Sequence, residues 1–470
     1  MPYDLILKNA RIITPQGERF GDLGITAGRI AAIGEIAAPA TRTIDATGLI
    51  VLPGGIDTHC HIAQRPIHGE QPSPDDFQTA TAAAAAGGTT TVIAHSMCPR
   101  GGNPADYLAD YLAQAETNAL IDYGVHLQMP DANPRFLAET LPQLAAQGFT
   151  SLKIFTTYDG YSLTDAEMLA VMQAAAPLGL LILIHAEDDA LIRHLTARAV
   201  AEGRTSLQDQ PTTRPIAAEA GMINRVAGYA KATGARVHIF HVTGTEAINE
   251  LTRARATGTS ITGETCTHYL SFTSADLARP SHQGAMYLST PPLRSQTDQD
   301  DLWAALADRR LHTVSSDHSP SHRRAQIARA EAGEPTPFTA FSGGTPGLQA
   351  LLPVLFSQGV STGRLTLARF AELTATAPAR LFGIPAKGTI EPGRDADLTL
   401  WDPDERWVMR HRDMHSRVDF TPWDGMAMTG RPVMTISRGR IIAQNGQIDR
   451  AAAGHGQLVR RQGGPPWPNG

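Results

Sequence analysis

Eight short apolar segments alternate with helical patterns through the middle of this 470-residue chain. They lie at 50–61, 89–96, 122–129, 150–158, 180–187, 235–242, 260–267 and 312–318. Apolar runs of this length are typical of buried strands, and parallel strands need crossover connections that are usually helices. The order therefore predicts an α/β fold with a (β/α)8 TIM-like barrel. An open doubly wound sheet is disfavoured, because no glycine-rich dinucleotide loop follows the first segment.

The sequence predicts the first residues of two helices in the middle of the chain. Ser73-Pro74-Asp75-Asp76 has the pattern of a capping box with proline at the first helical position, and Gly87-Gly88 ends that helix. Thr164 and Glu167 form a second capping box.

The two chain ends resemble each other and differ from the middle. Short strands separated by glycine turns are predicted at 4–13, 24–30, 41–45, 397–401 and 433–442, and Asn445-Gly446 is a hairpin signal. We expect residues 1–52 and 385–470 to form a discontinuous, smaller β-sandwich domain beside a barrel domain at 53–384. The stretch 451–470 is predicted to be an extended tail without a core of its own.

Composition excludes several classes of protein. Forty basic against forty-six acidic side chains give a net charge of −6, and no block of like charges suggests nucleic acid or an anionic membrane surface. The longest apolar run, 178–184, is too short to span a bilayer, and residues 1–13 lack the pattern of a signal peptide. Three cysteines make a disulfide framework improbable, which favours the cytoplasm.

The first barrel segment ends in Asp57-Thr58-His59-Cys60-His61. Alternate residues of a strand share a face, so Asp57, His59 and His61 point the same way and Cys60 points to the other side. Two imidazoles on one face suit a divalent metal, although two core histidines bonded to the backbone remain an alternative.

Other barrel segments also end in residues that bind metals. His185, His241 and Asp317 each stand at the end of an apolar run. The carboxyl ends of barrel strands form the catalytic rim, so these residues strengthen the prediction of a metal site. His95 and His126 also fall on strands, where structural hydrogen bonding is the expected role.

Lys153 lies between Leu152 and Ile154, where a buried ammonium is costly without a partner. Three interpretations are open: a lysine whose amine reaches the surface, a neutral catalytic amine, or a lysine converted to an anionic carbamate.

Together these motifs resemble the cyclic amidohydrolases of the amidohydrolase superfamily, most closely the dihydropyrimidinase and D-hydantoinase branch. The resemblance covers nearly the whole chain. It rests on the segments 53–61, 149–155, 316–318, 388–398, 418–425 and 437–440, with His185 and His241.

The resemblance implies a binuclear centre of two divalent ions, usually zinc. His59, His61 and Asp317 would hold one ion, and His185 and His241 the other. Lys153 would bridge them as N6-carboxylysine, formed with carbon dioxide or bicarbonate. Asp57 would support the ligands.

The same resemblance implies a reaction. A metal-bridging hydroxide would open a dihydropyrimidine or a 5-substituted hydantoin, giving an N-carbamoyl amino acid. Asp317 would move the proton, and Tyr158 would donate to the oxyanion. The main chain at Thr290 and Gly343 would bind the ring, at positions where the family often has serine and asparagine.

Two features leave alternatives open. The loop 63–71 is polar, so Arg65 or His68 could meet a polar or acidic ring substituent, or the loop could be a solvated lid. Glu264-Thr-Cys-Thr-His268 resembles the allantoinase and dihydroorotase version of that segment, which keeps allantoin as an alternative substrate. A third reading is a non-catalytic tetrameric scaffold of the same fold, which the complete ligand set argues against. The family implies a homotetramer or a dimer.

Overall fold

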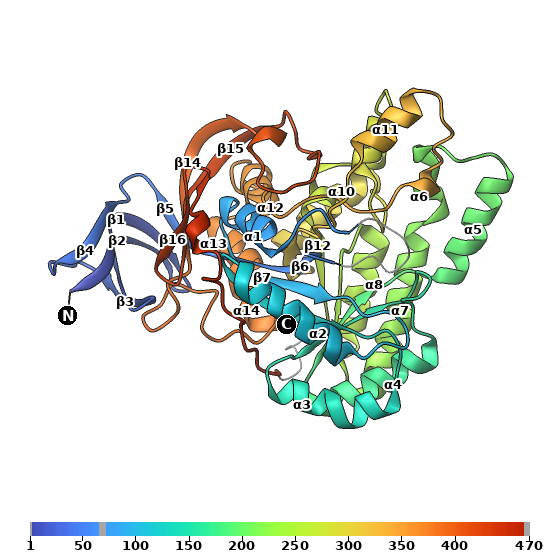
Figure 1. Cartoon of the computed structure of the whole chain (residues 1–470), viewed down its shortest axis with the longest axis horizontal. Helices are drawn as coiled ribbons and strands as arrows, with labels where there is room; N and C mark the ends of the chain where they lie inside the picture. The colour runs from blue at the N-terminus through green and yellow to red at the C-terminus, as the bar shows by residue number, and fades with distance from the viewer. Residues whose placement is uncertain (1, 65–71, 465–470) are drawn as a thin grey trace.

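The computed structural model describes residues 2–64 and 72–464. A parallel barrel surrounded by helices forms one part of the molecule, and a sheet built from both chain ends lies beside it (Figure 1). Among the described residues, none of the helices combines the length and the apolar composition that a membrane span requires.

Eight parallel strands form the barrel sheet in chain order from β6 to β13. They are β6 (Gly55–Cys60), β7 (Thr89–Ser96), β8 (Asp122–Gln128), β9 (Ser151–Phe155), β10 (Leu181–His185), β11 (Arg236–Ile239), β12 (Ile261–Cys266) and β13 (Thr313–Ser315). A parallel bridge from Cys60 to His318 joins the first strand to the segment after the last. Each strand lies within one predicted segment, so the predicted barrel is confirmed. Segment 50–61 breaks at Gly54, however, and its first part belongs to the other sheet.

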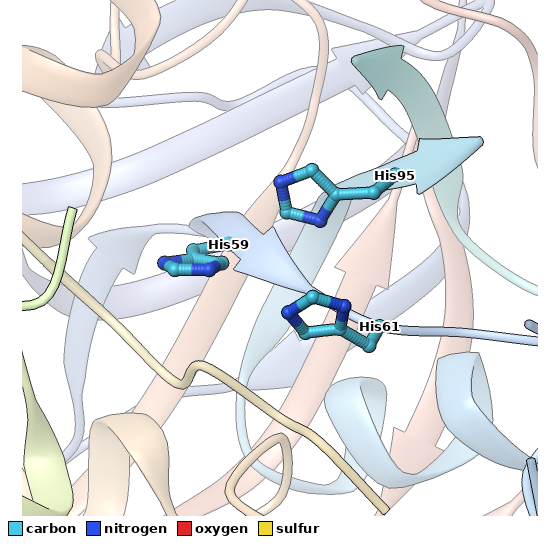
Figure 2. Close-up of side chains that lie close together, drawn as sticks. All are labelled: His59, His61 and His95. Carbon is cyan, nitrogen blue, oxygen red and sulfur yellow. The ribbon is translucent and has the colours of Figure 1, made fainter. Parts of the chain in front are cut away.

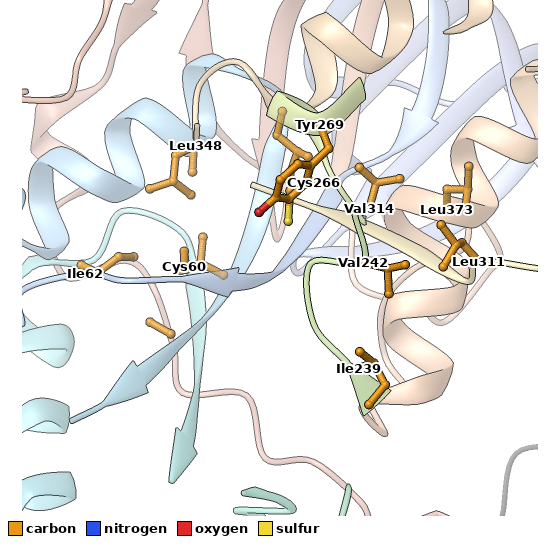
Figure 3. Close-up of a cluster of buried hydrophobic side chains, with 14 of the residues drawn as sticks. Cys60, Ile62, Ile239, Val242, Cys266, Tyr269, Leu311, Val314, Leu348 and Leu373 are labelled. Carbon is orange, nitrogen blue, oxygen red and sulfur yellow. The ribbon is translucent and has the colours of Figure 1, made fainter. Parts of the chain in front are cut away.

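Helices cover the barrel from outside (Figure 1). They are α1 (Phe77–Ala86), α2 (Pro104–Asn118), α3 (Leu141–Ala146), α4 (Asp165–Ala175), α5 (Asp189–Ala201), α6 (Gln210–Thr213), α7 (Ile216–Thr233), α8 (Thr245–Ala256), α9 (Thr267–Ser271), α10 (Gln296–Ala307), α11 (Arg324–Glu331), α12 (Leu351–Leu355), α13 (Leu367–Ala371) and α14 (Ala377–Leu381). Apolar side chains fill the layer between strands and helices, and Cys60 and Cys266 lie among them (Figure 3).

The predicted start of α1 was wrong by three residues, whereas that of α4 is confirmed. The capping box of α1 joins Asp76 and Thr79, not Ser73 and Asp76. Asp75 is instead used in tertiary contacts, since its carboxylate accepts from the side chain of Ser416 and from the backbone of Arg417 at 2.8 Å. The helix ends at Gly87 as expected.

The second sheet is mostly antiparallel and has nine strands, in the order β17-β16-β15-β14-β5-β1-β2-β3 with β4 beside β1. They are β1 (Tyr3–Thr14), β2 (Gly17–Thr26), β3 (Arg29–Gly34), β4 (Ala40–Asp45), β5 (Ile50–Pro53), β14 (Leu398–Val408), β15 (Ala427–Ser437), β16 (Arg440–Gln444) and β17 (Gln447–Ile448). Strand β5 pairs with β1 on one side and with β14 on the other, which joins the two chain ends. Its strands share a separate apolar core.

Turn geometry decided two details of this sheet. Asn445 and Gly446 both have positive φ, as a type I′ hairpin turn requires, so the predicted hairpin is confirmed. The segments predicted as one strand at 24–30 and at 433–442 instead hold turns at Ala27-Gly28 and at Arg438-Gly439, again with positive φ at each residue. Alanine and arginine are rare in that conformation, so only the glycine of each pair marked the turn. The boundaries at 52/53 and 384/385 stay a prediction.

The C-terminal tail packs along the barrel. Leu458 forms a parallel bridge with Tyr123, and the buried guanidinium of Arg461 donates to Ser151 Oγ at 2.6 Å. Nearby, Lys387 Nζ lies 2.7 Å from Asp122 and 3.2 Å from Asp395, and also pairs with Asp397. The Lys387 ammonium neutralises these three carboxylates. Because Asp122 belongs to the barrel and Asp395 and Asp397 precede β14, the ion pairs connect the barrel to the second sheet.

Candidate metal centre

A cavity of about 570 Å³ opens at the carboxyl ends of the barrel strands. The nine residues predicted to bind metal or substrate or to act in catalysis line it: His59, His61, Lys153, Tyr158, His185, His241, Thr290, Asp317 and Gly343. They come from segments that are far apart in the chain and that meet only because the strands share one rim. Asp57, predicted to support the ligands, is buried and is not among the lining residues. Arg65 and His68 lie outside the described residues.

His59, His61 and Asp317 form one group of the cavity wall. The Nε2 atoms of His59 and His61 lie 3.1 and 3.4 Å from the same oxygen, Oδ1 of Asp317. Their Nδ1 atoms have other partners, Glu264 Oε1 at 2.7 Å and Gln64 Nε2 at 2.8 Å. The hydrogen bond at Nδ1 fixes the orientation of each imidazole. The Nε2 atoms of both rings and Oδ1 of Asp317 therefore lie close together.

His95 lies beside His59 and His61 (Figure 2). One ring nitrogen from each of the three histidines lies within 4.8 Å of the other two. Nδ1 of His95 lies 3.2 Å from the carbonyl oxygen of Cys60. His126 is likewise engaged, with Nδ1 2.6 Å from Ser151 Oγ and Nε2 3.0 Å from the carbonyl oxygen of Thr58. His126 therefore makes the structural hydrogen bonds expected of it, whereas Nε2 of His95 is buried without a hydrogen-bond partner among the described residues.

His185 and His241 form the second group, with ring centroids 4.5 Å apart. Nε2 of His185 lies 2.7 Å from Glu187 Oε2, which leaves Nδ1 for another partner. Nδ1 of His241 is buried without a hydrogen-bond partner within the described part of the chain. Burial lowers the pKa of both imidazoles, so they are neutral, which is the form that binds metals.

Lys153 lines the same cavity as both groups of ligands and is fully buried. Its Nζ has no hydrogen-bond partner among residues 2–64 and 72–464, and it lies 4.6 and 4.2 Å from the ring centroids of Phe155 and Phe240. Burial lowers the pKa of this amine to about 7. The reading of a lysine that reaches the surface is wrong, and the neutral amine and the carbamate remain.

Three cavity residues hold strained backbone conformations. Tyr158, His241 and Asp317 have φ values of +84°, +42° and +42°. Each such conformation costs a non-glycine residue roughly 1–3 kcal/mol and persists only where the surrounding structure imposes it. The strain turns these side chains into the cavity just after their strands end.

Tyr158, Thr290 and Gly343 surround the ligand groups. Burial raises the pKa of Tyr158 to about 12, so its hydroxyl keeps its proton and can donate it. Gly343 and Thr290 touch: a Cβ added at Gly343 would lie 2.7 Å from both Oγ1 and Cγ2 of Thr290. Glycine at 343 is therefore matched to threonine at 290.

Two residues of the site were missed at the level of sequence. Glu187 and Arg214 form a buried ion pair behind His185. Burial opposes ionisation of Glu187, but Arg214 and His185 lower its pKa to about 2. Glu187 could have been found, because it stands two residues after His185, within the segment predicted at 180–187. Arg214 directly follows α6, and no motif in the neighbouring sequence indicates that it belongs to the site.

Comparisons with known proteins agree with this geometry. A model described as Amidohydrolase family matches residues 50–442. D-hydantoinase from Ralstonia pickettii is 39% identical over 447 residues, covering 94% of this chain and 96% of the relative. D-hydantoinase from Rhizobium radiobacter is 39% identical over 463 residues, covering 98% and 99%.

Solved structures give the same result. A structure of D-hydantoinase superposes with a TM-score of 0.93 at 38% identity, covering 98% of this chain and 99% of the other. A crystal structure of dihydropyrimidinase from Brevibacillus agri NCHU1002 superposes with a TM-score of 0.92 at 35% identity, covering 97% and 98%.

Proposed function

Because the chain belongs to the amidohydrolase family, we propose that it hydrolyses cyclic amides or imides, opening dihydropyrimidine or 5-substituted hydantoin rings. The product is an N-carbamoyl amino acid. The observation that carries the proposal is the convergence of four imidazoles, one carboxylate and one unpartnered buried amine on one cavity. The hydantoinase and dihydropyrimidinase names of its relatives support the same reaction.

The donor set fits two divalent metal ions, and zinc is the ion we propose. His59, His61 and Asp317 would hold one ion, and His185 and His241 the other. The buried, unpartnered Nδ1 of His241 and Nζ of Lys153 fit this assignment, since such atoms are costly without a ligand. When bound, such a pair of ions polarises a substrate carbonyl and lowers the pKa of a water molecule.

Lys153 would serve as N6-carboxylysine. Its neutral amine forms a bond to the carbon of carbon dioxide and releases a proton, which leaves an anionic carbamate. The conversion replaces an amine that has no hydrogen-bond partner among the described residues with an anionic group that carries two oxygens.

The remaining residues would transfer the proton, donate a hydrogen bond to the oxyanion and bind the substrate ring. Asp317 would take a proton from the attacking water and return it to the leaving nitrogen. Its contacts with His59 and His61, at 3.1 and 3.4 Å, support this role because they place it beside the proposed ion. The protonated hydroxyl of Tyr158 donates to the oxygen on which negative charge develops. The main chain at Thr290 and Gly343 would bind the imide.

A substrate panel tests the proposal. Protein purified with zinc and bicarbonate should open dihydrouracil or a hydantoin, and treatment with a chelator should abolish turnover until zinc returns. Turnover of allantoin alone would instead identify an allantoinase, which the D-hydantoinase relatives do not favour. Stoichiometric zinc also separates the enzyme from a non-catalytic scaffold, because the scaffold reading predicts no bound metal.

Assembly and location complete the proposal. We place the enzyme in the cytoplasm as a homotetramer or a dimer, acting on small molecules and on neither nucleic acid nor membranes. Light scattering coupled to size-exclusion chromatography measures the number of chains directly, and a monomeric mass would contradict the assembly.

A further inference from the structure

We propose that Arg214 is a positioning residue that orients both His185 and Tyr158, a metal ligand and the oxyanion donor of the proposed reaction. The inference rests on the proposed function for its kinetic consequences, but its effect on metal binding can be measured without turnover. Arg214 lines the cavity, and its side chain is 12% exposed.

The first link of Arg214 runs through Glu187. Nε of Arg214 donates to Oε1 of Glu187 at 3.1 Å, and Nη2 donates to Oε2. Oε2 is also the oxygen that lies 2.7 Å from Nε2 of His185. The two donations fix the plane of the carboxylate, and the carboxylate in turn selects the His185 tautomer that carries its proton on Nε2. Nδ1 of His185 is then left with a lone pair for a metal ion.

The second link runs to Tyr158. Nη2 of Arg214 lies 3.5 Å from the Tyr158 hydroxyl oxygen, and the guanidinium carbon lies 5.5 Å from the ring centroid. Arginine can only donate, so the tyrosine oxygen accepts in this contact. Arg214 therefore does not use the hydroxyl proton of Tyr158, whose hydroxyl group also contacts the side chain of Thr290. The ring is held beside His185, at 5.0 Å between centroids.

Arg214 is itself held by the segments that carry the other site residues. Its carbonyl oxygen accepts from Nη1 of Arg294 at 2.6 Å, and Nε of Arg294 donates to Oγ1 of Thr243 at 2.9 Å. Arg294 ends the segment of Thr290, and Thr243 follows His241 by two residues. The position of Arg214 is thus tied to the substrate segment and to the second histidine of the pair.

A lysine cannot replace this side chain. One ammonium on a flexible stem cannot meet two carboxylate oxygens and a hydroxyl with the fixed fork that a guanidinium presents. Retaining the charge should therefore preserve only part of the function, which distinguishes positioning from simple neutralisation of Glu187.

The experiment compares R214M and R214K with R193M. Arg193 is a matched control, because it also pairs with two carboxylates, those of Asp159 and Asp189, but is 51% exposed. Each variant is measured in three ways: thermal unfolding, zinc retention against a chelator, and kcat and KM for the ring that the wild type opens. The wild type and R193M should agree in all three.

We expect R214M to lose one of its two zinc ions at about 10- to 100-fold lower chelator concentration, as for loss of a group that orients a ligand. With zinc in excess, kcat should fall about 100-fold while KM changes less than about threefold, since the lost contact acts on the transition state. R214K should fall between R214M and the wild type.

Retention of zinc and kcat within twofold of the wild type in R214M would overturn the inference. A lower melting temperature with unchanged zinc affinity and unchanged kcat per folded molecule would do the same. If the wild type holds two zinc ions but opens none of the rings, the proposed function fails, and the zinc retention of R214M still decides whether Arg214 orients His185.

Discussion

Glu264 Oε1 lies 2.7 Å from Nδ1 of His59, and both side chains are fully buried. The contact joins residues 205 positions apart in the chain and turns Nε2 of His59 toward Asp317. A carboxylate behind a ligating imidazole fixes the tautomer and raises the basicity of the ligand atom.

The substitution Glu264→Gln should therefore weaken the zinc ion on the His59 side by about 10- to 100-fold. Burial raises the pKa of Glu264 to about 8, so the carboxyl group is charged where neighbouring cations, such as the proposed metal ions, favour that form. The amide keeps the shape of the side chain but cannot take this charge, so folding should survive. Chelator titration followed by zinc analysis measures the loss. The remote E372Q removes a carboxylate that pairs with Arg309 and Arg369, and it should retain both ions.

Removal of the Lys153 amine should abolish the bridging group. K153A should lose at least about 1000-fold in kcat, by analogy with the loss of a group that acts on the transition state itself. A short carboxylate such as propionate, added at millimolar concentration, should restore part of the activity, because it can enter the space left by the side chain. An effect of propionate on the wild type of equal size would contradict this reading.

Carbamylation should depend on pH with a defined sign. The Lys153 amine has its pKa lowered by burial to about 7, and only the unprotonated amine reacts with carbon dioxide. At equal dissolved carbon dioxide, metal-free protein should therefore form the carbamate at an initial rate about tenfold lower at pH 6 than at pH 8. Labelling with ¹³C carbon dioxide and carbon NMR measures how fast the carbamate signal appears.

Lys387 supplies an internal control for that experiment. Its ammonium is also buried, but its three carboxylate partners raise its pKa above the ordinary value. It should remain charged and unmodified, so the spectrum should contain one carbamate per chain. A signal that survives in K153A would show that another amine reacts.

Removal of the Tyr158 hydroxyl should affect the reaction and not the metals. Y158F should lower kcat by about 10²- to 10³-fold, the usual loss for one oxyanion donor, with zinc content unchanged. Y161F changes another tyrosine of the cavity wall and should lose less than about tenfold. Because the pKa of Tyr158 is raised to about 12, activity should show no ionisation of this residue below pH 10.

The close contact between Gly343 and Thr290 predicts non-additive substitutions. G343A should raise KM by about tenfold, because its Cβ would lie 2.7 Å from two atoms of the Thr290 side chain and push the ring-binding main chain apart. T290A removes those two atoms, so the double variant should recover much of the loss. Equal KM values for G343A and for the double variant would refute the clash as the cause.

The sequence was sufficient for whatever depends on local pattern. Strands at 89–96 and 181–185 and the histidine at 185 followed from apolar runs and from the residues that end them, since strand periodicity and the barrel rim are general rules. The hairpin at Asn445-Gly446 followed from turn chemistry. The family resemblance rested on the same local motifs.

Only the tertiary structure decided the contacts between distant segments. The carboxylate of Asp75 accepts hydrogen bonds from Ser416 and Arg417, and the N-cap of α1 is Asp76 instead of the predicted Ser73. Arg214 reaches Glu187 and Tyr158, and Glu264 reaches His59, across stretches of chain that no local pattern relates. The physical reason is that a buried polar atom takes whichever partner the packing brings within about 3 Å, and packing is a property of the whole chain.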